Sequence, residues 1–152
     1  MSFNTLLNDS IIEVDMDAKT KEELFAKIAK SLQDNDRLKS ADAFIADMKK
    51  QESLSTTNMG HGVALPIAHS IAVKKTTFML IKLENEIDWE DFGTPINLVF
   101  VLVGVHSSVI EEHKSFLLKL NSLINNKSFV GVMNGTKKPS VLLHRLKMAM
   151  GI

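Results

Sequence analysis

Histidine is the side chain in this sequence best suited to chemistry near neutral pH. An imidazole there can act as a nucleophile, as an acid–base group or as a metal ligand. The 152 residues contain no cysteine and no tyrosine, which excludes thiol nucleophiles, disulfides and cysteine-ligated zinc. The functional question narrows to five histidines, which are His61, His69, His106, His113 and His144.

A motif with fixed spacing runs from Glu52 to Ser70. A polar or acidic residue is followed, after six positions, by an apolar residue and a glycine. After two further positions come an aliphatic residue, alanine, a second aliphatic residue and proline, and a small residue stands two positions after the proline. The residues that fill these places without a gap are Glu52, Met59, Gly60, Val63, Ala64, Leu65, Pro66 and Ala68.

This motif resembles the phosphorylation-site signature of the IIA domain of the bacterial sugar phosphotransferase system (PTS), in its fructose/mannitol/nitrogen-regulatory class (EIIA type 2). The resemblance extends over almost the whole chain. The flanking matches are Ser55-Thr56-Thr57, Ile87-Asp88-Trp89, the segment from Pro95 to Phe100, and His113 at the start of an apolar helix.

One position of the motif departs from the family, and it is the central one. The phosphorylated histidine of the family directly follows the proline, where this chain has Ile67. Isoleucine has no lone pair and cannot accept a phosphoryl group. His69 is two residues further on, and in an extended chain it points to the same face, about 6–7 Å along the backbone. A register that treats Ile67-Ala68 as an insertion selects His69 as well, so His69 is the candidate phosphoacceptor.

The resemblance implies a relay role for the chain. It would accept a phosphoryl group from the histidine-containing phosphocarrier protein and pass it to a IIB domain during sugar uptake. His113 matches the family histidine that stabilises the phosphohistidine. A glycine-bordered loop can direct N–H groups at phosphate oxygens, so Gly60, His61 and Gly62 are expected to form the phosphate pocket with Ile67.

Two further hypotheses for the function of the same residues stay open. Ile67 also suits a phosphorylation-deficient IIA-like module that regulates a partner by binding it, because an apolar side chain makes the site more adhesive. A small-ligand binder using the same cleft is the third reading. A zinc site from His61, His69 and His113 has no recognised ligand spacing, so neither a metal nor another cofactor is expected.

Composition limits the partners and the location. The 18 basic residues balance 18 acidic ones, which argues against nucleic acid or an anionic membrane as the main partner. The longest apolar run spans about ten residues, whereas a membrane helix needs about 20. With no export signal near the N-terminus, we expect a cytoplasmic protein without membrane insertion. The choice between monomer and homodimer is left open.

The predicted elements that position these residues alternate between strands and helices. Strands are expected at 11–16, 63–65, 76–83 and 96–103, with Pro66 ending the second and loop structure from Ser53 to Gly62. Helices are expected from Thr20 (with Glu23 in a capping box), from Ser40, from Ser107 or Ser108 to Asn125, from Ser128 to Asn134, and from Pro139.

This order predicts an α/β domain, a mixed β-sheet flanked by helices. By resemblance it is the mannitol-type IIA fold, also called phosphotransferase/anion transport-protein-like. The length suits one domain, so residues 1–152 are expected to form a single PTS EIIA type-2 domain.

Overall fold

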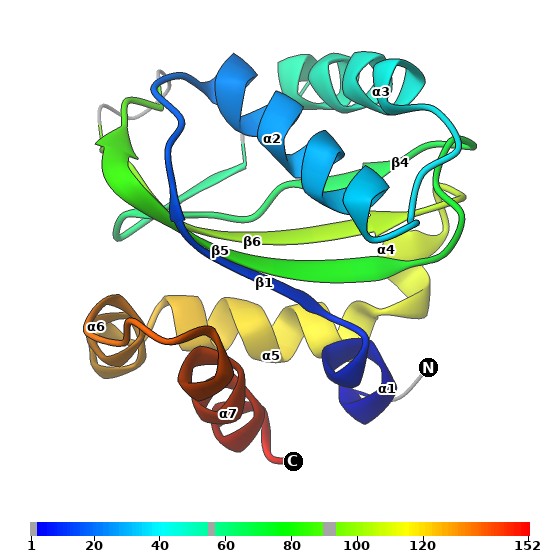
Figure 1. Cartoon of the computed structure of the whole chain (residues 1–152). Helices are drawn as coiled ribbons and strands as arrows, with labels where there is room; N and C mark the ends of the chain where they lie inside the picture. The colour runs from blue at the N-terminus through cyan, green and yellow to red at the C-terminus, as the bar shows by residue number, and fades with distance from the viewer. Residues whose placement is uncertain (1–2, 55–56, 90–93) are drawn as a thin grey trace.

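The computed structural model describes residues 3–54, 57–89 and 94–152. Figure 1 shows a single β-sheet with helices on both faces. The strands are β1 Ile11–Met16, β2 Asn58–Gly60, β3 Val63–Ala64, β4 Ile67–His69, β5 Thr77–Ile87 and β6 Ile96–Gly104. The helices are α1 Phe3–Asn8, α2 Lys21–Asp34, α3 Ala41–Leu54, α4 Val109–Glu112, α5 Lys114–Ile124, α6 Lys127–Asn134 and α7 Pro139–Met150.

The sheet is mixed, as the sequence predicts, and its order is β1-β5-β6-β3-β2. β5 and β6 are antiparallel, and β1 pairs with β5 in parallel. β3 and β4 both pair with β6 in parallel, one after the other along its length. Between them, the carbonyl of Pro66 accepts a hydrogen bond from the Leu102 N–H at 3.0 Å. β3 ends at Ala64, and after Pro66 the chain continues along β6 as β4.

Two hydrophobic cores lie on opposite faces of the sheet. The first is formed with α2 and α3, which cover one face in Figure 1, and the second with α1, α5, α6 and α7 on the other face. β6 contributes alternate residues to both cores, and all its residues except Asn97 are buried. The prediction that this strand is buried on both faces is confirmed. Among the described residues, no helix is both long and apolar enough to span a membrane.

The predicted start of α2 is confirmed in detail. Thr20 Oγ1 accepts a hydrogen bond from the Glu23 N–H at 3.0 Å, and Glu23 Oε2 accepts one from the Lys19 N–H at 2.6 Å. These side chains satisfy backbone donors that have no partner within the first helical turn. The face predicted to be apolar is buried, and it consists of Leu24, Phe25, Ile28, Ala29 and Leu32.

Two predicted segments are wrong. The loop expected from Ser53 begins later, because α3 continues to Leu54, and Asn58–Gly60 forms a strand paired with β3. The helix expected up to Asn125 is broken at His113, where φ is −118° and ψ is 26°. The apolar pattern hides the break because Phe116, Leu120 and Ile124 still share the buried face of α5.

A tight turn joins β2 to β3, and it contains three consecutive residues with positive φ. These are Gly60 (78°), His61 (58°) and Gly62 (78°). The carbonyl of Gly62 accepts hydrogen bonds from the N–H groups of Asn97 and Leu98 at 3.0 and 3.2 Å. A Cβ at Gly62 would lie 3.0 Å from Asn97 Oδ1, whereas one at Gly60 would meet nothing within 4 Å. Gly62 is therefore required for close packing as well as for backbone geometry.

These two glycines form a matched pair for a stability test. Gly60→Ala should lower the free energy of unfolding by about 1 kcal/mol, the cost of the left-handed conformation for alanine. Gly62→Ala should cost more, because the new methyl group also crowds Asn97. Urea denaturation of both variants measures the difference, and an equal or smaller loss for Gly62→Ala would contradict this packing.

Candidate functional site

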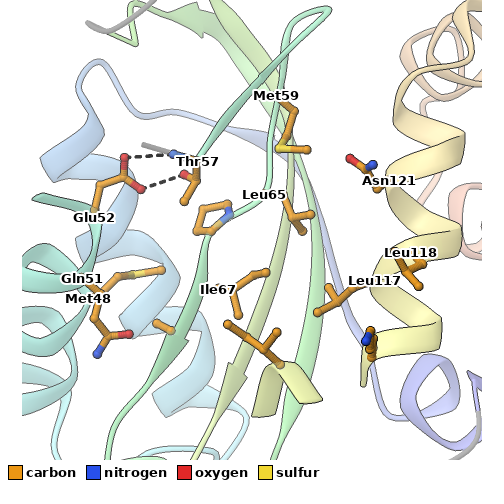
Figure 2. A pocket seen from close by; sticks show the side chains of 14 residues that line it. Met48, Gln51, Glu52, Thr57, Met59, Leu65, Ile67, Leu117, Leu118 and Asn121 are labelled. Carbon is orange, nitrogen blue, oxygen red and sulfur yellow. Dashed lines mark hydrogen bonds between the residues drawn. The ribbon is translucent and has the colours of Figure 1, made fainter. Parts of the chain in front are cut away.

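A cavity of about 490 Å³ lies where α3, the chain around β4, and α5 meet (Figure 2). Nine of its fourteen lining side chains are apolar. In Figure 2, Leu117 and Asn121 of α5 face Met59, Leu65 and Ile67 across the open space. The full lining is Met48, Gln51, Glu52, Thr57, Met59, Leu65, Pro66, Ile67, Ala68, Ile110, Lys114, Leu117, Leu118 and Asn121.

Ile67 lines this cavity from β4. It is half-buried, pairs with Leu102 of β6, and packs against the core on the α5 side of the sheet. Ala68 is buried in the opposite core, as the alternation of strand side chains requires. The side chain at position 67 therefore gives the cavity an apolar wall instead of an imidazole.

His69 ends β4, opposite Gly104, and is exposed. It does not line the cavity. The side-chain amide of Gln51 binds its backbone on both sides: Gln51 Nε2 donates to the His69 carbonyl at 2.8 Å, and the His69 N–H donates to Gln51 Oε1 at 2.9 Å. Gln51 thus occupies backbone groups that an edge strand would otherwise leave open, and it fixes β4 to α3.

Glu52 occupies a polar corner of the cavity. Its side chain is only 7% exposed, and Oε2 lies 3.1 Å from Lys21 Nζ. The Thr57 hydroxyl donates to Oε1 at 2.7 Å, and the Thr57 N–H donates to Oε2 at 3.4 Å. Lys21 Nζ also lies 4.6 Å from the centre of the Trp89 ring, within cation–π range. Glu52 therefore ties α2 and α3 to the segment that leads into β2.

His113 lies between α4 and α5 and is 4% exposed. Its Nδ1 lies 2.9 Å from the Val109 carbonyl oxygen. Because a carbonyl only accepts, Nδ1 carries a proton and donates it to Val109, and Nε2 is the ring nitrogen outside this contact. This buried Nε2 has no hydrogen-bond partner in the described parts of the chain. His113 is not among the residues that line the cavity.

The structure brings together only some of the predicted site residues. Ile67 lines the cavity, while Gly60, His61 and Gly62 form the β2–β3 turn and do not. No hydrogen bond joins His69 to His113 within the described residues. His61, His106 and His144 are exposed, and in residues 3–54, 57–89 and 94–152 no three histidine or acidic side chains form a group able to hold a metal ion.

Sequence reasoning missed the residues that hold the site in place. Gln51 and Lys21 act through partners 18 and 31 residues away in the sequence, and no local pattern reveals such contacts. Lys114 and Asn121 of α5 were also missed as lining residues. They are seven residues apart, which is about two helical turns, and Leu117 and Leu118 lie between them. This spacing is the sequence feature that could have placed both residues on one face of the helix.

Comparison with known proteins agrees with this fold. The family model described as "Phosphoenolpyruvate-dependent sugar phosphotransferase system, EIIA 2" matches residues 5–148. The chain is 23% identical over 148 residues to the PTS system 2-O-alpha-mannosyl-D-glycerate-specific EIIABC component of Escherichia coli (strain K12). That match covers 96% of this chain and 22% of the relative. The chain thus spans about a fifth of the length of the first curated relatives it matches.

Solved structures share the fold. The nitrogen regulatory protein IIA-Ntr from Neisseria meningitidis has a TM-score of 0.74 and 24% identity, with 95% of this chain and 94% of that one covered. The Escherichia coli complex of enzyme IIA mannitol with phosphorylated enzyme IIB mannitol has a TM-score of 0.70 and 17% identity, with 91% and 92% covered. The mannitol-type IIA fold expected from the sequence is confirmed.

The fold, the motif and the family match define a IIA domain of the phosphotransferase system. This chain belongs to the EIIA type-2 family, the fructose/mannitol/nitrogen-regulatory class that the motif indicates.

The two hydrogen bonds between the Gln51 side chain and the His69 backbone can be tested by mutation. Gln51→Ala should lower the free energy of unfolding by about 1 kcal/mol, since two partly exposed hydrogen bonds are lost. It should also speed hydrogen exchange of the His69 amide, measured by NMR. Gln33→Ala, at an exposed glutamine of α2, is the matched control and should stay within about 0.5 kcal/mol. Unchanged exchange at His69 in Gln51→Ala would contradict the role of this amide.

Proposed function

We propose that the chain is a IIA component of a phosphoenolpyruvate-dependent sugar phosphotransferase system that relays a phosphoryl group through His69. The observation that carries the proposal is the exposure of His69 on the strand that bears the family motif, with its backbone held by Gln51. An exposed imidazole is accessible to a partner protein. The neutral form of an imidazole is a nucleophile.

The transfer requires two partners, both inferred from the family. A ring nitrogen of His69 would attack the phosphorus of the phosphohistidine on the histidine-containing phosphocarrier protein. The N–P bond to the donor breaks as the bond to His69 forms, and the donor histidine keeps the electron pair. In the second transfer a IIB domain is the acceptor, the kind of partner in the solved mannitol complex. The work is mainly in-line positioning and charge stabilisation. As part of this proposal, we expect the relay to need no metal or other cofactor and to operate in the cytoplasm.

His113 has a supporting role in this proposal. Its Nδ1–H is engaged by the Val109 carbonyl, which fixes the ring, and Nε2 is left without a partner among the described residues. This ring nitrogen is therefore free to form a hydrogen bond with another group. On the family resemblance, we assign His113 to stabilising the phosphohistidine. Phosphate binding by the turn from Gly60 to Gly62 stays a prediction.

A phosphorylation assay tests the relay directly. With labelled phosphoenolpyruvate and the general phosphotransferase proteins, the protein should gain acid-labile label. His69→Ala should abolish the label, because the proposed acceptor is removed. His144→Ala replaces another exposed histidine, outside the predicted phosphate pocket, and should leave the label unchanged. Label that survives His69→Ala, or an unlabelled wild-type protein, would rule out the relay through His69.

A second candidate function is supported by Ile67. Its side chain makes the centre of the motif apolar and half-buried within the cavity. This observation favours a phosphorylation-deficient IIA-like module, which would regulate a partner by binding without transferring phosphate. The two candidates differ in whether the cavity region still supports phosphoryl transfer.

Replacing Ile67 by histidine separates the two candidates. Under the relay proposal, Ile67→His combined with His69→Ala should regain the label that His69→Ala loses, because the cavity wall then carries a nucleophile at the motif position. The double variant Ile67→Ala with His69→Ala is the control and should stay unlabelled. A folded Ile67→His/His69→Ala protein without label would mean that the surroundings no longer support transfer, as the binding module predicts.

A further inference from the structure

The apolar cavity beside Ile67 is lined by one cationic side chain, Lys114, that makes no ion pair or hydrogen bond with the described residues. Most polar groups of its lining are already engaged: Glu52 by Lys21 and Thr57, and the Gln51 amide by the His69 backbone. Lys114 and the Asn121 side chain have neither a hydrogen bond nor an ion pair with the described residues. Since Glu52 is neutralised by Lys21, Lys114 carries the only uncompensated charge of the described lining, and that charge is positive.

We propose that this cavity binds a small monocarboxylate with an unbranched apolar tail. The carboxylate pairs with Lys114, which supplies the complementary charge, and the tail lies between α5 and the wall formed by Met59, Leu65 and Ile67. The site goes beyond phosphoryl transfer and stands whether or not His69 accepts phosphate.

The geometry of α5 sets the size of the ligand. Lys114 and Asn121 both line the cavity and are seven residues apart, about 10 Å along a helix axis. Leu117 and Leu118 lie between them, so the cationic end is followed by an apolar surface and then by an amide. A medium-length tail spans this distance. The volume of about 490 Å³ is within the range of small-molecule sites, roughly 300–1,000 Å³.

Exposed apolar side chains at the rim support an occupant of this kind. Leu118 is 62% exposed and Ile110 is 50% exposed, and both line the cavity. A bound tail would remove part of this surface from water, which is the main source of affinity for an apolar ligand. A purely polar ligand would leave these side chains in water and would find few free hydrogen-bonding groups.

Octanoate is a suitable probe, with butyrate, hexanoate, 1-octanol and octylamine as comparisons. Isothermal titration calorimetry of the full chain should show binding that rises about fourfold per methylene until the cavity is filled. Octanoate should bind more tightly than octylamine. NMR of methyl-labelled methionines should show shifts at Met48 and Met59, which line the cavity, and none at Met133 or Met150.

A pair of lysine variants tests the head-group contact. Lys114→Gln should weaken octanoate about threefold, the size expected for an exposed ion pair, and should leave 1-octanol unchanged. Lys119→Gln makes the same change in charge on α5 at a position that does not line the cavity, and should have no effect. Both lysines are exposed, so neither variant endangers folding.

Several results would overturn the proposal. These are absence of octanoate binding, equal binding of octylamine, equal effects of the two lysine variants, or shifts confined to Met148 in the separate groove between α6 and α7. None of these results depends on phosphate transfer. Failure of the ligand site and failure of the relay through His69 are therefore distinguishable.

Discussion

The pairing of β6 with three other strands is the constraint on which the rest of the structure depends. β6 is antiparallel to β5 along one side, and along the other it pairs with β3 and then with β4. Its side chains enter both cores, so it cannot shift by one residue without exchanging its two buried faces. Every position of β4 is therefore fixed by its partner on β6.

This pairing separates Ile67, at the motif position, from His69, the proposed phosphoacceptor. Ile67 is opposite Leu102 and faces the cavity, and His69 is opposite Gly104 at the end of the strand, where it is exposed. The same end of β6 also organises the region around His113. A Cβ at Gly104 would lie 2.6 Å from a Val109 methyl group, and the Val109 carbonyl binds the His113 ring. The end of β6 at Gly104 is thus next to both regions: His69 lies exposed opposite it, and the buried His113 is held through Val109.

Much of the fold could be predicted from the sequence because its signals are local. Thr20 and Glu23 are three residues apart and act on the same helical turn, and the apolar run of β6 reflects burial on both faces. The motif around Pro66 led to the family, and the family led to the fold. These inferences needed only neighbouring residues and their spacing.

The contacts that shape the site were beyond sequence reasoning because they join distant segments. The Gln51 amide holds His69, and Lys21 neutralises Glu52 above the Trp89 ring. The short β2 exists because β3 pairs with it, and neither strand is long enough to show a periodic pattern. The break at His113 lies within a continuous apolar pattern. The motif selected Ile67 and His69, but only the register with β6 distinguishes a cavity wall from an exposed imidazole.

The most direct test of this account is the reactivity of each histidine toward diethyl pyrocarbonate, mapped by mass spectrometry on the folded protein. The structure predicts that His69 reacts at a rate similar to those of the exposed His61, His106 and His144, while the buried His113 is strongly protected. Protection of His69 would contradict the placement of β4 and the assignment of His69 as an accessible histidine. Reaction of His113 as fast as the others would contradict its burial.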